Sequence, residues 1–325
     1  MLSRVADSLY WMSRSIERAE HTTRLLDVNL NLMLDESATN ADRCWQRMLQ
    51  ALGNPEHIEW TGDPYALTQA LTFDTENKAS ILSCIISARE NSRHVREQIS
   101  TEQWTRLNQL YLQVTRPEMR SDIQDVGDSG QPTEFLQQVM EAVHQFQGVS
   151  DSTMSHGEGW QFIQVGRYIE RASATALLLE AYHEDLWLHA DRIPEGNEYL
   201  EWMGLLRSAT AFEAYCKVYT ADITPDKILE FLLLDEEFPH SVRFSIDTLQ
   251  NALEAIHGEG GEIRAAPLRR LVGRLQASLN YSSVDEILSG DTVAYLRSIQ
   301  FQCRSIHEMI YEIYIDYSIQ AALAG

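Results

Sequence analysis

Apolar residues recur every three or four positions through the first thirty residues of the chain. The series begins with Leu2, Val5 and Leu9 and continues at the same spacing to Met33. Side chains three and four residues apart share one face of an α-helix, so this series forms the apolar seam of a single long helix. We expect that helix to begin near Ser3 and to end around residues 35–37.

The same spacing predicts a succession of further helices, separated by clusters of glycine and proline. Their expected ranges are 41–52, 64–72, 75–98, 102–115, 133–148, 159–188, 197–219, 225–234, 240–257, 264–280 and 290–322. No segment shows the alternation of apolar and polar side chains that is typical of a half-buried strand. The pattern therefore predicts an all-α protein, folded as a helical bundle.

The chain contains two copies of an R-x-x-E-R-A sequence. The first copy, Arg14 to Ala19, aligns with Arg167 to Ala172 at an offset of 153 residues, and the match continues to Thr22 and Thr175. An internal duplication explains such a repeat. We expect two pseudo-repeated helical halves, residues 1–150 and 151–325, packed as one continuous bundle through the two long signature helices.

Charged residues occupy the side of the first signature helix that lies opposite its apolar seam. Arg14 and Arg18 are four residues apart on this side, Glu17 is within reach of both, and Trp11 lies about one turn before them. Since apolar residues follow on the same side, neighbouring helices should cover it and enclose a polar zone. The second copy repeats this geometry with Arg167, Glu170 and Arg171.

A third arginine cluster lies in the segment 81–96. Arg89, Arg93 and Arg96 continue its apolar stripe, with Glu90 and Asn91 beside them. Arginines that face inward need carboxylate or carbonyl partners, because an unpaired buried charge is very costly. We therefore expect the two signature glutamates to be buried and each paired with an arginine, with Arg89 or Arg93 as candidate partners from another helix.

Two interpretations of these clusters remain open. The arginines and glutamates form either a structural network that fixes helix register, or a pocket for a carboxylate or phosphate. The second interpretation predicts a cavity where the Arg14 and Arg18 face meets the arginines of segment 81–96, with Tyr10 and Trp11 as an aromatic wall. The candidate ligand-binding residues are Trp11, Arg14, Glu17, Arg18, Arg89, Glu90, Asn91, Arg93, Arg96, Arg167, Glu170 and Arg171.

Four motifs together resemble the bacterial alpha-E family, a helical domain with a repeated Glu-Arg signature. They are Tyr10-Trp11-x-x-Arg14-x-x-Glu17-Arg18-Ala19-Glu20, Gly159-Trp160-x-Phe162-x-x-x-Gly166-Arg167-x-x-Glu170-Arg171-Ala172, Ala88-Arg89-Glu90-Asn91-x-Arg93, and Phe231-Leu-Leu-Leu-Asp235-x-x-Phe238-Pro239-x-Ser241-Val242. The resemblance spans essentially the whole chain. The second signature copy is less polar than the first, because Ala174 and Leu177 stand where the first copy has His21 and Arg24.

The resemblance implies a functional setting. Members of the family accompany a circularly permuted ATP-grasp protein and a transglutaminase-like or proteasome-like peptidase, and ATP-grasp enzymes join a carboxylate to an amine through an acyl phosphate. It therefore implies a helical accessory subunit that acts with an ATP-grasp amide ligase in peptide or protein modification, binding a carboxylate or phosphate at the arginine clusters. The alternatives are an enzyme in its own right, either a ligase-associated transferase or a metal-dependent oxidase, and a purely structural scaffold.

Charge and composition exclude several other functions. The chain has 26 Lys and Arg against 48 Asp and Glu, a net charge of −22, which disfavours binding to nucleic acid or to an anionic membrane surface. It has no P-loop motif and no placed nucleophile and base, so no catalytic residue is predicted. The apolar runs are too short to span a membrane and no signal peptide is recognisable, so we expect a cytoplasmic protein.

We also expect no cofactor and no metal site. Three Glu-x-x-His spacings lie in expected helices, at Glu141/His144, Glu180/His183 and Glu254/His257. Two such pairs with two further glutamates build the metal site of di-iron bundles, which is the basis of the oxidase alternative. In a chain with 10 histidines and abundant glutamate, about one such spacing arises by chance.

Overall fold

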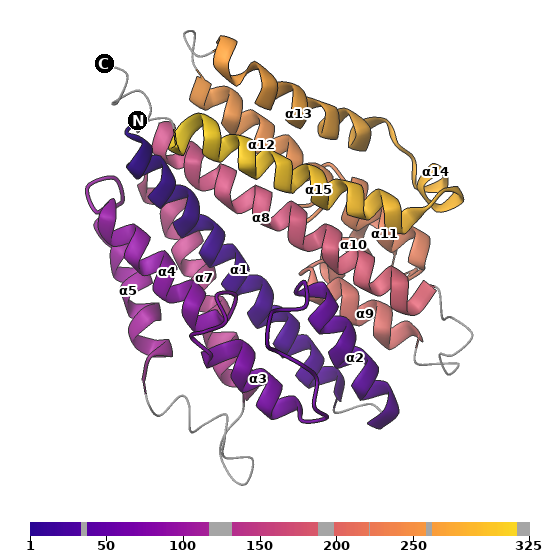
Figure 1. Cartoon of the computed structure of the whole chain (residues 1–325). Coiled ribbons are helices and arrows are strands. Elements are labelled where there is room, and N and C mark those ends of the chain that lie inside the picture. Colours follow the sequence, from indigo (N-terminus) through magenta and orange to yellow (C-terminus); the bar gives the residue numbers. More distant parts are fainter. Residues whose placement is uncertain (34–37, 117–131, 188–197, 221, 258–261, 317–325) are drawn as a thin grey trace.

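The computed structural model describes residues 1–33, 38–116, 132–187, 198–220, 222–257 and 262–316, and within them every regular element is a helix (Figure 1). The helices are α1 (Ser3–Met33), α2 (Ala38–Ala51), α3 (Pro64–Phe73), α4 (Ile81–His94), α5 (Thr101–Val114), α7 (Pro132–Thr153), α8 (Glu158–Tyr182), α9 (Glu198–Ser208), α10 (Phe212–Tyr219), α11 (Pro225–Leu234), α12 (Val242–His257), α13 (Glu262–Tyr281), α14 (Val284–Ser289) and α15 (Thr292–Ile310). Two short π-helices, η1 (His183–Trp187) and η3 (Tyr311–Ile315), follow α8 and α15. The predicted all-α fold is confirmed.

Two predicted helices were wrong in their extent. The helix expected over 75–98 begins only at Ile81, because the Ser80 side chain caps it by accepting a hydrogen bond from the Ser83 amide. The helix expected over 197–219 is two helices, α9 and α10. Between them Thr210 adopts a left-handed conformation (φ 55°). No glycine or proline marks this break in the sequence.

A short helix between the last two predicted ones was missed. It is α14, and a capping box between Ser283 and Glu286 begins it. The helix α15 then begins after Asp291, whose side chain accepts a hydrogen bond from the Ala294 amide. The end of this expected helix after residue 316, and the expected turns around 35–37, 127–131, 193–196 and 258–261, lie outside the described residues.

Each half of the chain contains a ring of four helices packed in the same order. In the first half α1 packs against α4, α4 against α5, α5 against α7, and α7 against α1. In the second half α8, α12, α13 and α15 make the corresponding four contacts. The two long helices α1 and α8 lie side by side at the centre of the molecule (Figure 1). Each therefore belongs to its own ring and also joins the two rings.

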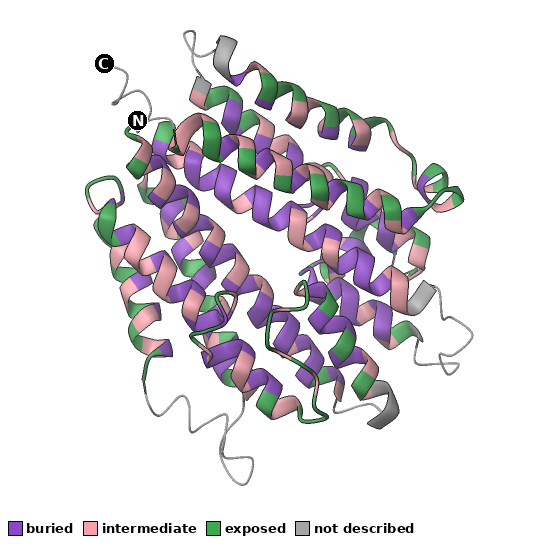
Figure 2. Ribbon diagram, viewed as in Figure 1, coloured by how far each residue is buried: buried purple, intermediate pink, exposed green. Residues whose placement is uncertain are grey.

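Short helices tie each half to the other. The helix α2 of the first half packs against α8, and α9 of the second half packs against α1. One apolar core contains residues of both halves, among them Leu9, Ile85, Leu249 and Ile299, and buried residues follow α1 and α8 along their length (Figure 2). These matched contacts support the predicted duplication, whose test remains the superposition of the two halves.

The backbones of α1 and α8 come very close at one point. A Cβ atom added to Gly166 would lie 2.4 Å from the carbonyl oxygen of Tyr10. On the other side of the crossing, Ser13 donates a hydrogen bond of 2.6 Å to the carbonyl of Ile163. Under the offset of 153 residues Ser13 corresponds to Gly166, and Tyr10 corresponds to Ile163. The two copies thus meet through equivalent positions.

We predict that Gly166→Ala destabilises the protein, because the new methyl group would push the backbones of α1 and α8 apart. The expected cost is about 1–3 kcal/mol of unfolding free energy, measured by chemical denaturation. Gly148→Ala in α7 is the matched control: its Cβ would meet nothing within 4 Å. That change should instead stabilise the helix by about 0.5–1 kcal/mol. Equal effects of the two substitutions would contradict the close crossing.

Candidate functional site

The signature ion pairs cross from one copy to the other. Glu170 of α8 accepts hydrogen bonds from Arg14 Nε at 2.7 Å and from Arg18 Nε at 2.6 Å, both on α1. In the opposite direction Arg171 of α8 donates to Glu17 of α1 through Nε at 2.5 Å and Nη2 at 2.9 Å. Each signature glutamate is therefore held by arginine of the other signature helix.

The predicted burial of the two glutamates is confirmed, since Glu17 is 4% and Glu170 9% exposed. The predicted partners Arg89 and Arg93 were wrong. Arg89 donates to Asn108 at 3.0 Å and lies 4.3 Å from the ring centre of Tyr111, both on α5. Arg89 thus has its partners on α5 and Arg93 pairs with Glu90 within α4, whereas the signature helices lie against each other and so supply each other's partners.

The two glutamates differ in their electrostatic surroundings. Burial alone would raise the pKa of Glu170, but the guanidinium groups of Arg14 and Arg18 outweigh it and lower that pKa to about 2. Complete burial raises the pKa of Glu17, and the neighbouring Glu20 carboxylate raises it further, against the lowering by Arg171. Arg167, the counterpart of Arg14, also lowers the pKa of Glu17, but it makes no ion pair with a described residue. The two helices exchange ion pairs in both directions, but the pKa of Glu170 is lowered and that of Glu17 is raised.

Aromatic side chains border Arg14 on its outer side. Its guanidinium lies 4.8 Å from the ring centre of Trp11 and donates to the Tyr10 hydroxyl at 3.2 Å. That hydroxyl lies 2.8 Å from Nδ1 of His307 on α15. Burial raises the pKa of Tyr10 to about 12 and lowers the pKa of His307 to about 4, so both are neutral near pH 7, and the tautomer of His307 decides which of the two groups donates. Tyr10 and Trp11 therefore hold Arg14 in place against Glu170.

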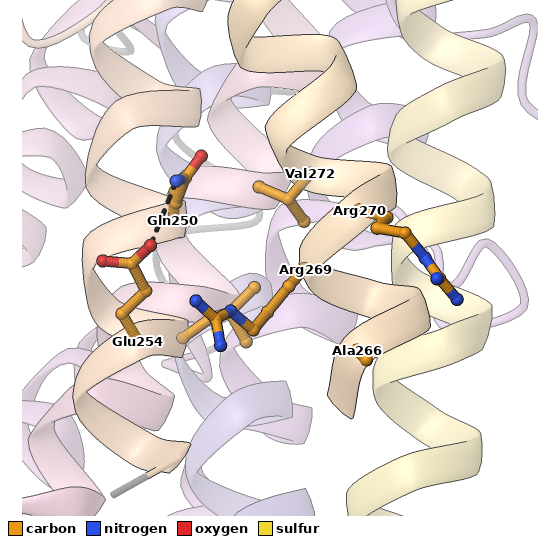
Figure 3. Close-up of a pocket in the computed structure, with 7 residues that line it drawn as sticks. Gln250, Glu254, Ala266, Arg269, Arg270 and Val272 are labelled. Atoms are coloured by element: carbon orange, nitrogen blue, oxygen red, sulfur yellow. Dashed lines mark hydrogen bonds between the residues drawn. The ribbon is translucent and has the colours of Figure 1, made fainter. Parts of the chain in front are cut away.

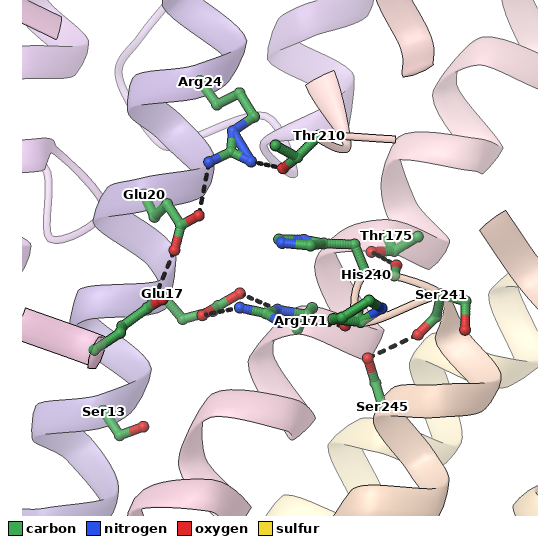
Figure 4. Close-up of polar contacts among 12 residues, drawn as sticks. Ser13, Glu17, Glu20, Arg24, Arg171, Thr175, Thr210, His240, Ser241 and Ser245 are labelled. Atoms are coloured by element: carbon green, nitrogen blue, oxygen red, sulfur yellow. Dashed lines mark hydrogen bonds and ion pairs between the residues drawn. The ribbon is translucent and has the colours of Figure 1, made fainter. Parts of the chain in front are cut away.

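A second set of polar residues, missed by the sequence reasoning, continues from Glu17 along α1 (Figure 4). Glu20 accepts hydrogen bonds from Arg24 Nη2 at 2.7 Å, from Gln147 Nε2 at 2.8 Å and from His144 Nε2 at 3.2 Å. Arg24 also donates to the Thr210 hydroxyl in the turn between α9 and α10. The sequence did contain a signal for this second polar set, because Glu20, His21 and Arg24 occur in the first signature copy and not in the second.

The loop before α12 explains the Phe238-Pro239-x-Ser241 motif. Arg171 Nη1 donates to the carbonyl of Pro239 at 3.2 Å, and the Thr175 hydroxyl donates to the carbonyl of His240 at 3.1 Å. Ser241 Oγ accepts a hydrogen bond from the Phe244 amide at 3.0 Å and so caps α12. His240 itself points from this loop into the space between Arg24 and Arg171 (Figure 4). The motif therefore completes the partners of a signature arginine.

A second buried ion-pair network joins α2, α9 and η1. Arg47 is 1% exposed and pairs with Glu201, which is fully buried, and with Asp185 at 2.7 Å. Arg43 pairs with the same two carboxylates at 3.0 and 3.2 Å. These residues stand far apart in the chain, and no motif or local spacing marked them. They fix the short helices that cross between the halves.

The outer face of α4 carries the remaining predicted residues. Arg93 is largely exposed and pairs only with Glu90, at 3.0 Å, while Arg96 lies 5.4 Å from the ring centre of Trp104. Asn91 donates to the carbonyl of Ser87 within α4 at 2.9 Å. It also lines a cavity of about 620 Å³ between α1 and α4, together with Arg4, Ser8 and His94 among others.

Arg14 and Arg18 contact Glu170 on α8, so the structure gives the α1 arginines and the α4 arginines different partners. The sequence predicted one cavity between the Arg14 and Arg18 face of α1 and the arginines of segment 81–96. In the structure these two sets of arginines lie in separate surroundings. Arg14, Arg18 and Arg171 are paired with buried glutamates, whereas Arg93 and Arg96 are more accessible. Among the arginines predicted from the sequence, Arg93 and Arg96 are accessible, and Arg167 makes no ion pair with a described residue.

A further cavity with arginines in its wall, of about 320 Å³, lies between α12 and α13 (Figure 3). Leu253, Ala266 and Val272 form its apolar part, and Arg269 and Arg270 border it.

Within the described part of the chain, no group of three or more His, Cys, Asp or Glu is placed to hold a metal ion. Nor does any helix described here have the length and apolar character needed to cross a membrane.

The fold and the site together define a class: an all-α bundle of two four-helix rings, joined by reciprocal Glu-Arg pairs between its two central helices. The family model described as "a predicted alpha-helical domain with a conserved ER motif", named Alpha-E, matches residues 1–315, and the chain belongs to this family. The Glu17-Arg18 and Glu170-Arg171 pairs are two copies of such an ER sequence in this chain.

Among curated proteins, the chain is similar to uncharacterised proteins of mycobacteria. Identity is 24% over 304 residues to one from Mycobacterium bovis and 23% to another from Mycobacterium tuberculosis, in each case over 87% of this chain. The chain spans about a third (33%) of the length of these relatives. No solved structure matches it significantly.

We predict that Glu17→Ala is strongly destabilising, because it leaves the buried guanidinium of Arg171 without its carboxylate. The expected loss is about 3–5 kcal/mol of unfolding free energy. The double variant Glu17→Met with Arg171→Met removes both charges together and should be more stable than Glu17→Ala. A thermal midpoint of Glu17→Ala equal to that of the parent would contradict the buried pair.

We predict a distinct pH dependence for Glu170. Its pKa of about 2 in the folded protein lies below the value of about 4.3 for an unfolded glutamate, so its pairing stabilises the fold fully above about pH 4.3. That contribution is lost as the pH falls from about 4.3 towards 2. The stability deficit of Glu170→Gln should therefore narrow over this interval. Glu90→Gln, on an exposed pair, should show little deficit at any pH.

Proposed function

We propose that this chain is a helical binding subunit that acts with an ATP-grasp amide ligase in peptide or protein modification. In this proposal it holds a carboxylate or phosphate group of the substrate with Arg93 near the end of α4 and Arg96 just after it. The observation that carries the proposal is the distribution of charge. Arg14, Arg18 and Arg171 are neutralised by buried Glu17 and Glu170, whereas Arg93 has only its exposed pair with Glu90 and Arg96 makes no ion pair with a described residue.

The chemistry of this face suits an anionic group. Guanidinium groups bind carboxylates and phosphates through two parallel hydrogen bonds, and accessible arginines need little rearrangement to do so. Trp104 lies beneath Arg96 and supports it from α5. In a chain of net charge −22, a local excess of arginine attracts an anion that the rest of the surface repels.

The neighbouring cavity of about 620 Å³ adds room for more of the substrate. Its volume is within the range usual for small-ligand sites, and Asn91 and His94 bring it to the same end of α4 as Arg93. The polar side chains Arg4 and Ser8 of α1 lie on its other wall. A peptide whose carboxylate meets Arg93 and Arg96 can extend from this end of the helix.

The mycobacterial relatives support a role alongside another protein. In them the matching region is about a third of a longer chain, so it is joined to a large additional part. A domain that occurs within a longer chain fits an accessory module. In this proposal the reciprocal signature pairs are the scaffold that holds α1 and α4 in position for the ligand.

The test is the ATP turnover of the co-purified ATP-grasp partner, measured with and without this chain. The double variant Arg93→Gln, Arg96→Gln should keep the thermal midpoint of the parent, because both side chains lie outside the core. Its stimulation of the partner should fall about tenfold or more, since a hydrogen bond to a charged group contributes roughly 1.5–3 kcal/mol.

Two single variants serve as controls. Arg304→Gln removes an exposed arginine of α15 and should leave the stimulation unchanged. Arg270→Gln examines the arginine-lined cavity between α12 and α13. Full stimulation by the double variant would refute the α4 site, and loss of stimulation in Arg270→Gln alone would place the anion between α12 and α13 instead.

A further inference from the structure

A small polar cavity lies beside the signature pairs, and two of the atoms in its wall are buried without a hydrogen-bond partner. These atoms are His21 Nε2 on α1 and Ser208 Oγ at the end of α9. Buried polar atoms in native proteins are almost always hydrogen-bonded. The cavity has a volume of about 20 Å³, which is enough for one molecule of the size of water.

The walls of this cavity form a built site. Glu17, Glu20, Arg24, Arg171 and Thr175 all line it, and each is more than nine-tenths buried. Their side chains come from the two signature helices and are fixed by hydrogen bonds to α7, to the turn after α9 and to the loop before α12. The volume is therefore bounded by side chains that cannot easily move to fill it.

The hydrogen-bonding state of His21 follows from its contacts. Burial lowers the pKa of His21 to about 4, so the imidazole is neutral near pH 7. The ring also makes a hydrogen bond with the backbone of Ala51, and because Nε2 has no partner, this bond uses Nδ1. A neutral ring whose Nδ1 carries the proton presents a lone pair at Nε2. The occupant of the cavity must therefore donate a hydrogen bond to His21.

The charges around the cavity favour a neutral occupant. Arg24 and Arg171 balance Glu20 and Glu17 within the wall itself. Just outside it, Arg14 and Arg18 share the single carboxylate of Glu170, which leaves an excess of positive charge. A cation is disfavoured by that excess. Chloride has no hydrogen to donate to His21, and anions that carry an O–H group, such as bicarbonate, are too large for about 20 Å³.

We propose that this cavity binds one small neutral molecule, water or ammonia, which donates a hydrogen bond to His21 Nε2 and exchanges a second with Ser208 Oγ. The site belongs to the first signature copy alone. On α8 the residue equivalent to His21 is Ala174, which also lines the cavity, and its small side chain leaves the space open. The reciprocal Glu-Arg pairing does not require such a cavity.

Ammonia is the occupant with a chemical consequence, an inference that rests on the proposed function. An ATP-grasp ligase makes an acyl phosphate, and ammonia can attack its carbonyl carbon. The carbon–nitrogen bond then forms, the bond from that carbon to the phosphate oxygen breaks, and one proton of the nitrogen leaves with the phosphate. The product is a primary amide. A site that holds ammonia would supply the amine for this ligation.

The test measures occupancy in the isolated chain and needs no ligase, so its failure is distinct from a failure of the proposed function. Water relaxation dispersion in H₂¹⁷O detects a buried water of long residence. Proton-detected ¹⁵N spectra in ¹⁵NH₄Cl detect bound ammonia. Each is recorded for the parent and for Ala174→Ser, whose hydroxyl should take the place of the occupant, and for His21→Phe, which removes the acceptor.

We expect one long-lived molecule in the parent that is absent from both variants. Loss of a ¹⁷O dispersion step identifies water and excludes the ammonia role, while loss of a bound ¹⁵N signal identifies ammonia. Identical dispersion and ¹⁵N spectra in parent and variants would overturn the site. If Ala174→Ser does not fold, His21→Phe decides between these outcomes by the same two measurements.

Discussion

The close crossing of α1 and α8 is the constraint on which the rest of the structure depends. Gly166 lets the backbone of α8 approach the carbonyl of Tyr10, and at this separation a glutamate of each helix reaches arginine of the other. A buried charge without its partner is costly, so the two pairs favour one relative position of the helices over any shifted one. The pairs thus specify register, while the apolar core supplies most of the stabilisation.

That register also fixes the outer elements. Arg171 has a further N–H group to satisfy once Glu17 is paired, and the carbonyl of Pro239 accepts it. The loop before α12 must therefore lie over α8, which places the start of α12 and so the second ring of helices. In the first half Glu20 holds α7 in the same manner through Gln147 and His144. Polar contacts that begin at the crossing extend outwards in this way to both four-helix rings.

Periodicity was enough to predict most of the helices and the burial of Glu17 and Glu170, because both follow from the faces of single helices, but it missed the break between α9 and α10 and the short helix α14. The partners could not be predicted, because pairing depends on which helices become neighbours. Arg89 shows the difference. Its face was correctly linked to an apolar stripe, but its partners are aromatic and amide side chains of α5 and the neighbouring Glu90, and not a signature glutamate. The pair of Arg47 with Glu201 joins residues 154 apart, beyond the reach of any local spacing.

The difference between the two signature copies distinguishes the contacts that helix packing explains from those that it does not explain. Residues present in both copies make the reciprocal pairs, and such symmetrical contacts are explained by packing alone. The polar residues beside Glu20 differ between the copies: His21 corresponds to Ala174 on α8, and Arg24 corresponds to Leu177. Packing does not require polar groups there, and buried polar groups are retained only where hydrogen bonds compensate for lost hydration. The α1 side of the crossing, rather than the signature pairs themselves, therefore carries the buried polar groups that packing alone does not explain.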